Sequence, residues 1–575
     1  MKLLLRSTCF LSLALCLFLG VPVQQLVAQG SGNLKPVNRT YALTNVNIMQ
    51  APGKSLGMGT VLIKDGLIIG VGSNVAIPAD AQQIKADSMY VYAGFIEGAS
   101  HTAVPKPKAD RNRPRVEVPG NPPNDVAGIM PERSVKELLK ADDKSISAMR
   151  ALGFTASHTL PHGNPLPGQG AIILLDGKSA DEMIYMEHAS LFSTLQGNRG
   201  VYPGTVIGVM AKFRDLYRNA ELSKSHADKY ASNPLGKARP NNDRVLAAFY
   251  PSIDKEQNIF FHTQNLSSAY RALRLQKDLG FNLTLVELKE GWELIDKIKG
   301  TGTKVFLSSD LPKKPDAKKK DKEEGEEMTM AEKEVEALEA RKAEWYKKYA
   351  SQAAKFHDAG ISFGLSNLEV SGKNLKSNLR TMIEHGLSED AALAALTTGP
   401  AELLGLSSVM GTVEKGKMAN LVISDMPYFE EKSQVRYVFV DGNMYEYAAK
   451  AKKKKKSKDG AEPSGETNMA AVLGEWSFEA ETPGQSGTGT ITFTEENGDI
   501  VGTLESDQGP GEVQDLSNVI LDGNDLSFSM SIDGGGQSIT IEISVVLDGE
   551  SFEGDMEVGS FGSFPIKGER TSKPE

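Results

Sequence analysis

Cysteine is nearly missing from this chain of 575 residues, since Cys9 and Cys16 are the only two and both lie near its start. The remaining sequence offers no thiol for a disulfide, for nucleophilic catalysis or for a zinc site with sulfur ligands. A chain without disulfides must be stabilised by a large hydrophobic core. The length predicts about two to four domains, because a single core rarely grows beyond about 300 residues.

Positive charge is scarce relative to negative charge, since 64 lysines and arginines stand against 74 aspartates and glutamates. The formal net charge of −10 argues against nucleic acid as a partner. The contents of 40% hydrophobic and 24% charged residues are typical of a soluble globular protein. A small molecule or another protein is therefore the expected partner.

Long apolar runs are rare, and the longest covers Cys9–Val23, after the basic residues Lys2 and Arg6. This pattern predicts a secretory signal over residues 1–28, which would direct the protein to the periplasm or the extracellular space. The run is short for a membrane span, and an uncleaved anchor is the alternative. Cys16 raises a lipoprotein as a further alternative, although the surrounding residues fit that signal poorly. We expect no transmembrane segment in the mature chain.

Residues 94–408 alternate between short apolar runs and amphipathic helical patterns. Such alternation over roughly 300 residues is typical of a parallel α/β barrel, for which about 250 residues is usual. A charged segment at 312–343 interrupts the pattern and predicts a solvated helical insertion. The predicted strands cover 151–160, 171–175, 259–262, 283–287, 304–307 and 361–366, and the predicted helices cover 266–278, 290–299, 345–358 and 388–396.

The segments before and after this region, 41–93 and 409–447, consist of short predicted strands separated by turns. A lysine-rich segment at 448–468 predicts a linker. Beyond it, residues 469–575 show about eight short alternating strands, which indicates a small antiparallel barrel or sandwich. Acidic residues greatly outnumber basic ones in this last segment, so its surface should be strongly negative.

Ordered motifs near both ends of the α/β region resemble the amidohydrolase superfamily. The family's opening pattern is similar to Val61–Gly72 followed by Tyr92–Glu97. Its closing pattern is similar to Ala394–Ala401 and Gly411–Lys417. The motif Gly168–Ala171 resembles the imidazolonepropionase-like branch of the same family.

The resemblance covers residues 41–447 and implies a particular domain organisation. A (β/α)8 TIM barrel over 94–408 would be clasped by a composite β-sandwich domain made from 41–93 and 409–447. Residues 469–575 resemble a lipocalin-like β-barrel in their opening motif and number of strands. The combined expectation is an α/β protein with a small composite β-domain and a C-terminal antiparallel β-barrel.

By this resemblance the barrel would hold a divalent metal such as zinc at the carboxyl ends of its strands. Metal-bound water would hydrolyse a C–N bond, with a cyclic amide as the expected substrate class. His101 and His262 occupy two of the implied ligand positions. Asn367 stands at the position of the catalytic aspartate, and an amide is neither an anionic ligand nor a useful proton acceptor. The other implied ligand positions hold Ala99, Gln264 and Leu288.

A different metal site is the alternative. His158 and His162 flank the end of the predicted strand 151–160, which should open on the same end of the barrel. With the two retained histidines they would form a new ligand set, to which Glu97 or Glu287 would add a carboxylate. Ordinary loop histidines are the simpler interpretation.

Three functions follow from these residues. The first is an exported amidohydrolase that hydrolyses non-peptide C–N bonds. The second is a homologue without catalysis, acting as a binding or partner module, for instance beside an active amidohydrolase. The third places the function in the C-terminal β-module, with the barrel as its carrier.

Overall fold

A computed structural model of the chain describes residues 40–572, with gaps at 108–115, 316–328, 371, 449–471 and at the turns 483–484, 497–498, 508–512, 523–524, 535–536 and 559–561. The predicted signal and almost all of the predicted linker lie outside these described residues. The chain divides into two compact units, Met1–Ala451 and Lys452–Glu575, and each is described by itself. Within the described residues, no helix combines the length and the apolar character that crossing a membrane requires.

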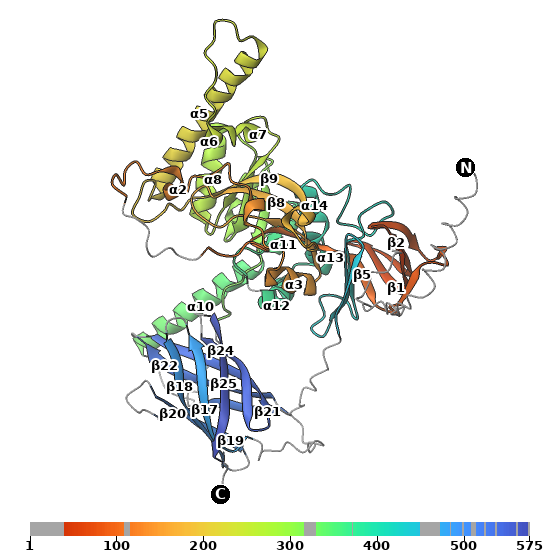
Figure 1. Ribbon diagram of the computed structural model, residues 1–575, viewed down its shortest axis with the longest axis vertical. Helices are drawn as coiled ribbons and strands as arrows, with labels where there is room; N and C mark the ends of the chain where they lie inside the picture. Colours follow the sequence, from red (N-terminus) through yellow and green to blue (C-terminus); the bar gives the residue numbers. More distant parts are fainter. Residues whose placement is uncertain are drawn as a thin grey trace, which may run out of the picture. The chain divides into compact units, whose positions relative to one another are not determined.

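Eight strands of the first unit close into a barrel in the order β10-β11-β12-β13-β6-β7-β8-β9 (Figure 1). Every strand predicted between residues 151 and 366 overlaps one of them, so the prediction of an α/β barrel is confirmed at this level. The barrel strands are β6 (Phe95–Ser100), β7 (Phe154–Thr159), β8 (Gly168–Leu174), β9 (Ile184–Thr194), β10 (Asn258–His262), β11 (Leu283–Leu288), β12 (Lys304–Ser308) and β13 (Gly364–Ser366).

The barrel departs from the expected regular (β/α)8 pattern at β8. This strand pairs antiparallel with both of its neighbours, β7 and β9, whereas the other neighbouring pairs are parallel. A parallel strand needs a crossover of about a dozen residues, usually with a helix. Residues 160–167 between β7 and β8 contain no helix, so the chain turns back directly.

The helices of the barrel begin and end at residues with clear capping chemistry. Helix α8 (Leu266–Leu279) begins where the Asn265 side chain accepts a hydrogen bond from the Ser268 amide, and it ends at Gly280 in the left-handed conformation. Helix α10 (Met330–Ala350) begins in the predicted charged insertion and continues beyond its predicted end at residue 343. The longest helix of the described residues, α5 (Val206–Ser232), was not predicted.

Apolar side chains fill the barrel interior, as is usual for this architecture. Phe260 and Phe306 stack there with ring centroids 6.0 Å apart. A Cβ on Gly98 would lie 2.1 Å from the Phe306 ring, and one on Gly364 would lie 2.5 Å from it. The absence of a side chain at these two glycines therefore leaves room for the Phe306 ring. The packed interior separates the two ends of the barrel.

A second sheet combines strands from both sides of the barrel sequence. Its order is β16-β15-β14-β5-β1-β2-β3, and β4 pairs with β1. The strands are β1 (Thr40–Ala51), β2 (Lys54–Lys64), β3 (Leu67–Gly72), β4 (Gln82–Lys85), β5 (Tyr90–Ala93), β14 (Leu421–Ser424), β15 (Val435–Val440) and β16 (Asn443–Glu446). The antiparallel pair β5–β14 joins the early strands to the late ones.

The second unit is a single antiparallel sheet of nine strands in the order β20-β19-β18-β17-β25-β24-β23-β22-β21. The prediction of a C-terminal antiparallel β-barrel of about eight strands is confirmed only in part, because the pairing order is open. Its two ends are β20 (Val513–Asp515) on β19 and β21 (Ser517–Asp522) on β22, which only Leu516 separates along the chain. The other strands are β17 (Gly474–Thr482), β18 (Gln485–Glu496), β19 (Asp499–Ser506), β22 (Asp525–Gly534), β23 (Gln537–Asp548), β24 (Ser551–Val558) and β25 (Gly562–Ser572).

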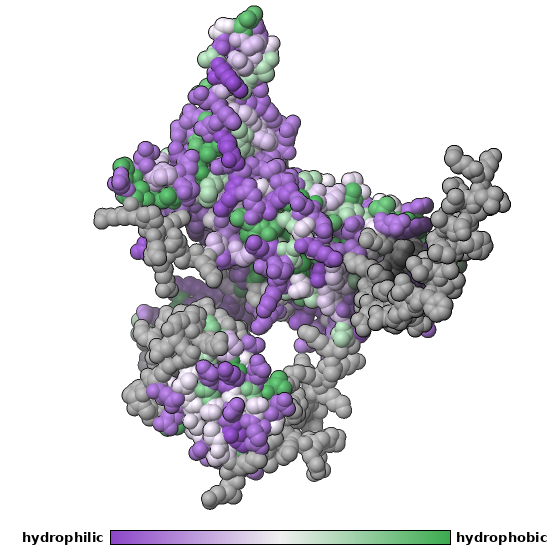
Figure 2. Space-filling view, viewed as in Figure 1, coloured by the Kyte–Doolittle hydropathy of each residue, from purple (hydrophilic) through white to green (hydrophobic). Residues whose placement is uncertain are grey.

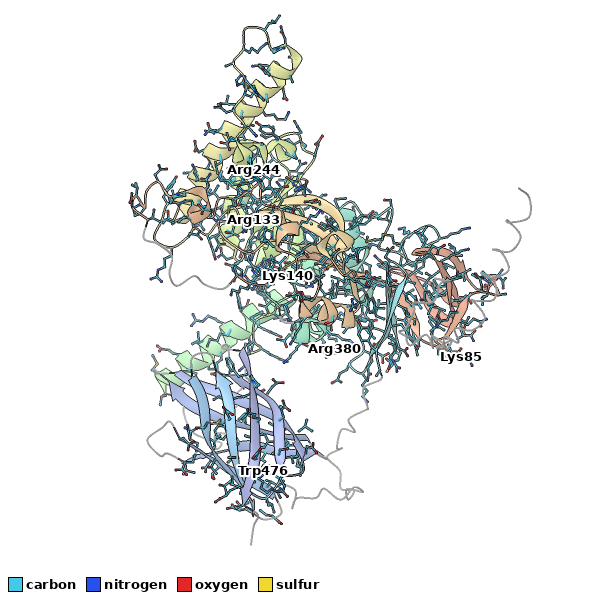
Figure 3. All side chains as sticks on the ribbon, viewed as in Figure 1. Lys85, Arg133, Lys140, Arg244, Arg380 and Trp476 are labelled. Carbon is cyan, nitrogen blue, oxygen red and sulfur yellow. The ribbon has the colours of Figure 1, made fainter. Side chains whose placement is uncertain are left out.

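The nine-stranded sheet has its own apolar core around Trp476 of β17, labelled in Figure 3. Trp476 is fully buried, and its Nε1 donates to the Val472 carbonyl oxygen over 2.8 Å. The Arg570 guanidinium lies 4.5 Å above the ring. A separate core of this kind indicates that the unit can fold as an independent domain.

Candidate functional site

Two predicted histidines meet at the carboxyl ends of the parallel barrel strands. His101 follows β6, and His162 lies in the turn after β7. Their rings stack with centroids 3.7 Å apart. Because a carbonyl oxygen only accepts, His101 Nδ1 donates to Leu160 over 2.8 Å, and His162 Nε2 donates to Val104 over 3.1 Å.

This stacked histidine pair is uncharged at neutral pH. Burial, together with the neighbouring His162, lowers the pKa of His101 to about 3. Burial also lowers the pKa of His162. The unprotonated nitrogens are then His101 Nε2 and His162 Nδ1, for which the described residues provide no hydrogen-bond partner. The pair therefore presents acceptors and no positive charge.

Glu369, just beyond β13, is the centre of a charged network at the same end of the barrel. It accepts hydrogen bonds from Gln264 Nε2 over 2.6 Å and from Lys289 Nζ over 2.7 Å. His262 Nε2 lies 3.3 Å from its carboxylate but is not aligned as a hydrogen bond. His262 and Lys289 hold the pKa of Glu369 well below its usual range. The carboxylate stays ionised and well compensated.

Asn367 lies in a buried hydrogen-bond network with Glu97 of β6. The Asn367 Nδ2 donates to Glu97 over 3.0 Å, and its Oδ1 accepts from Ser309 over 2.7 Å. Thr102 also donates to Glu97, over 2.7 Å. Burial raises the pKa of Glu97. Asn367 supplies the buried Glu97 with a donor that an ionised aspartate would lack.

A second buried carboxyl, Glu287, lies at a backbone irregularity of β11. Its φ of 55° is in the left-handed region, at the point where the β11–β12 register shifts. Ser366 donates to it over 2.5 Å, and Ser308 donates to its other oxygen. Burial raises the pKa of Glu287 as it does that of Glu97. Both buried acids are held by hydroxyl or amide donors.

His158 lies apart from the stacked pair, inside the barrel wall. Its Nδ1 donates to Gly98 over 3.0 Å, and its Nε2 contacts the Ser190 hydroxyl over 2.8 Å. The ring also packs edge-on against Phe260, with centroids 4.6 Å apart. Burial lowers its pKa to about 4. Since both nitrogens are already bonded, His158 has no free atom for a ligand.

The structure thus separates the four candidate histidines. His101 and His162 stack, His262 faces Glu369, and His158 lies in the wall. Sequence reasoning did not identify Glu369 or Lys289 as functional candidates. The only available signal was position, because Glu369 follows Asn367 by two residues at a strand end and Lys289 directly follows β11.

The residues at this end of the barrel do not fit the divalent metal that the resemblance implies. In the described part of the chain, no three His, Cys, Asp or Glu side chains are grouped as metal ligands. Ala99 is buried within the apolar barrel interior. Both polar atoms of the Asn367 amide are bonded to protein groups. We therefore assign no catalytic step to a bound metal at this end of the barrel.

Comparison with known proteins relates this barrel to amidohydrolases. The amidohydrolase family model matches residues 284–445. A solved amidohydrolase from Thermotoga maritima MSB8 has 20% sequence identity and a TM-score of 0.58, covering 71% of this chain and 100% of that one. A Xaa-Pro dipeptidase with bound methionine in its active site has 14% identity and a TM-score of 0.40, covering 71% and 100% respectively. No curated protein matches the chain. Residues 284–445 therefore match the amidohydrolase family, and the first unit shares the fold of a solved amidohydrolase.

Proposed function

We propose that this chain is an exported amidohydrolase-family protein of the imidazolonepropionase-like branch that binds an amide-bearing small molecule without metal-dependent hydrolysis. The observation that most directly supports the absence of metal-dependent hydrolysis is the Asn367–Glu97 hydrogen bond of 3.0 Å. By resemblance a catalytic aspartate would stand at residue 367. The amide found there is neutral and is already bonded within a buried network.

The class of ligand follows from the stacked histidine pair. His101 Nε2 and His162 Nδ1 carry lone pairs that a ligand can use, while their other nitrogens are bonded to backbone carbonyls. Acceptors without charge suit a neutral donor such as an amide N–H. Glu369 adds a carboxylate whose charge Lys289 compensates, and one of its oxygens lies 3.3 Å from His262 Nε2. A small cyclic or acyclic amide is the ligand that this arrangement favours.

Metal-dependent hydrolysis of a C–N bond is the second candidate. The family-model match over residues 284–445 favours it. So does the electrostatic influence of both His162 and His262 on His101, which indicates three imidazoles at one end of the barrel. This candidate requires that the stacked pair rearrange to bring the histidines around one ion.

Metal analysis of protein purified without chelators separates the two functions. We expect less than about 0.1 metal ion per chain, since a working site of this type binds its ion tightly. Bound zinc that disappears in both His101→Ala and His262→Ala would contradict the proposal and support hydrolysis. Activity gained by the double variant Asn367→Asp with Ala99→His would show that the barrel still supports the chemistry.

Binding itself is tested by calorimetry with a series of cyclic amides. His162→Phe keeps a flat ring in the stack and removes its nitrogen acceptor, so amide binding should weaken. His226→Phe is the matched control, because this histidine is exposed on α5. Equal affinity of the His162→Phe variant and the unchanged protein would sink the proposed binding mode.

A further inference from the structure

A cavity of about 590 Å³ opens at the amino end of the barrel, opposite the candidate site. Asn258, Leu283 and Lys304, the first residues of β10, β11 and β12, contribute to its lining. Leu403 and Leu404, at the end of α14 (Thr398–Leu403), also line it. The packed barrel interior separates this cavity from the stacked histidine pair, so it does not belong to the site proposed above.

Lys304 brings a partly buried positive charge to this cavity. Its Nζ donates to the Leu403 carbonyl oxygen over 2.7 Å. Among the described residues, Lys304 has no ion pair within 4.0 Å. The nearby Glu402 accepts a hydrogen bond from Ser362 instead, over 2.8 Å. Burial lowers the pKa of Lys304, and the negative charge of Glu402 offsets this effect only in part.

A second polar group in the same layer lacks a partner. Thr284 is fully buried, and its Oγ1 has no hydrogen-bond partner in the described structure. In the parallel ladders Thr284 pairs with Lys304 on one side and with Phe260 on the other. Paired residues of neighbouring strands point to the same face, and both of these partners line the cavity. The Thr284 hydroxyl therefore lies in the layer that closes the cavity.

The rest of the lining combines apolar walls with polar groups. Met186 and Leu404 are the accessible apolar residues of the lining, whereas Phe260, Leu283 and Leu403 are themselves almost fully buried. Amides of Asn258 and Gln276 add neutral hydrogen-bonding groups. A lining with both polar groups and apolar side chains can hold a small molecule that carries a charge and an apolar part.

We propose that the amino end of the barrel binds a small organic monocarboxylate, whose charge meets Lys304 beside the buried Thr284 hydroxyl and whose apolar body packs on Met186 and Leu404. Lys304 is the half-buried cation of the lining and suits a single negative charge, whereas the second lysine, Lys255, is exposed and donates to the Gly280 carbonyl oxygen. The exposed Glu256 in the same lining disfavours a dianion such as phosphate. The proposal stands on the lysine, the hydroxyl and the cavity, and it does not depend on the function of the other end.

Calorimetric titration of the full chain with phenylacetate, acetate and inorganic phosphate tests this site. Phenylacetate should bind more tightly than acetate, because only its ring uses the apolar walls, and phosphate should not compete. Lys304→Met should weaken phenylacetate binding at least about tenfold, since it removes a charged hydrogen-bond donor. Lys299→Met is the control, because Lys299 is exposed on the same barrel end and does not line the cavity.

Thr284→Val is a second variant that tests the same site if Lys304→Met folds poorly. The substitution preserves shape and removes the orphan hydroxyl, so the ligand-free protein should be at least as stable. Its phenylacetate affinity should nevertheless fall severalfold. No binding to the unchanged protein, undiminished binding to either variant, or tighter binding of phosphate would each overturn the proposal.

Discussion

At the residue scale, Asn367 shows how one amide determines the charge at the carboxyl end of the barrel. Asn367→Asp replaces the donor to Glu97 by a second acid, so the two carboxyls must share a proton. We expect a loss of about 1–3 kcal/mol of unfolding free energy, growing as pH rises from 5 to 8 (roughly the range where sharing that proton becomes costly). Urea unfolding at both pH values measures it.

Asn374→Asp is the control for this substitution, since Asn374 is exposed on α12 (Gly372–Glu384). It makes the same change of charge without a buried partner. An equal effect of the two substitutions would contradict the assigned role of Asn367.

The carboxyl groups of Glu97 and Glu369 predict opposite pH dependences for their glutamine variants. The pKa of Glu97 is raised, so its protonated form stabilises the fold fully below the unfolded pKa of about 4.3. That contribution is lost as pH rises toward the folded value. The pKa of Glu369 is lowered, so its contribution is present above about 4.3 and is lost as pH falls.

Unfolding free energies measured from about pH 3 to 8 cover the pH ranges in which both carboxyl groups should affect stability, and they test the two pKa directions. Glu97→Gln should remove part of the decline toward high pH. Glu369→Gln should remove part of the decline toward low pH. Variants that shift the curve uniformly would refute the pKa assignments.

The sequence predicted the location of some residues of the candidate site but not of others. The order of motifs indicated that His101, His262 and Asn367 would lie at strand ends. The separation of His158 depends on which side of β7 faces inward, a register that the short apolar run does not specify. Glu369 and Lys289 form a functional candidate only through contacts across 80 residues of sequence.

At the element scale, the fit of β6, β12 and β13 around one aromatic ring is testable. Gly98→Ala places a methyl group 2.1 Å from a ring atom of Phe306. We expect a loss of about 1–3 kcal/mol from this overpacking, measured by thermal unfolding. Adding Phe306→Leu should recover part of the loss. Gly300→Ala, with nothing within 4 Å of the added carbon, is the control and should be nearly neutral.

Sequence patterns predicted element type better than element direction. The run that became β8 was recognised as a strand, but its antiparallel orientation depends on the direct return over residues 160–167. Helix α5 carries a periodic buried face and was detectable. Its face is visible in the sequence at Val209, Phe213, Leu216, Tyr217 and Ala220. In β9 only the last five residues are fully buried, which weakens the strand signal.

At the scale of the whole molecule, the two units should fold independently. Trp476 is the one tryptophan between residues 452 and 575, and it is fully buried. A fragment of residues 469–575 should therefore show blue-shifted emission that moves to longer wavelength in urea. Emission already at the unfolded wavelength in buffer would mean that this unit depends on the first one.

Figure 2 shows a mainly hydrophilic face, with apolar residues scattered over it. The prediction of a separate C-terminal β-module required only its regular turns and alternating residues. The extent of closure of its sheet was not predictable, since it depends on how the short segment of β20 and β21 divides its pairing between β19 and β22.

The interruption of the nine-stranded sheet at Leu516 has a consequence for solution behaviour. β20 and β21 end the described pairing order on either side of this residue, and the exposed Val513 and Ile520 lie on them. Terminal strands invite pairing with another chain, and like charge between chains discourages it. Asp515 is exposed on β20, so repulsion between the acidic chains should oppose such pairing at low salt. Concentration-dependent light scattering that rises when salt is added at neutral pH would reveal this association.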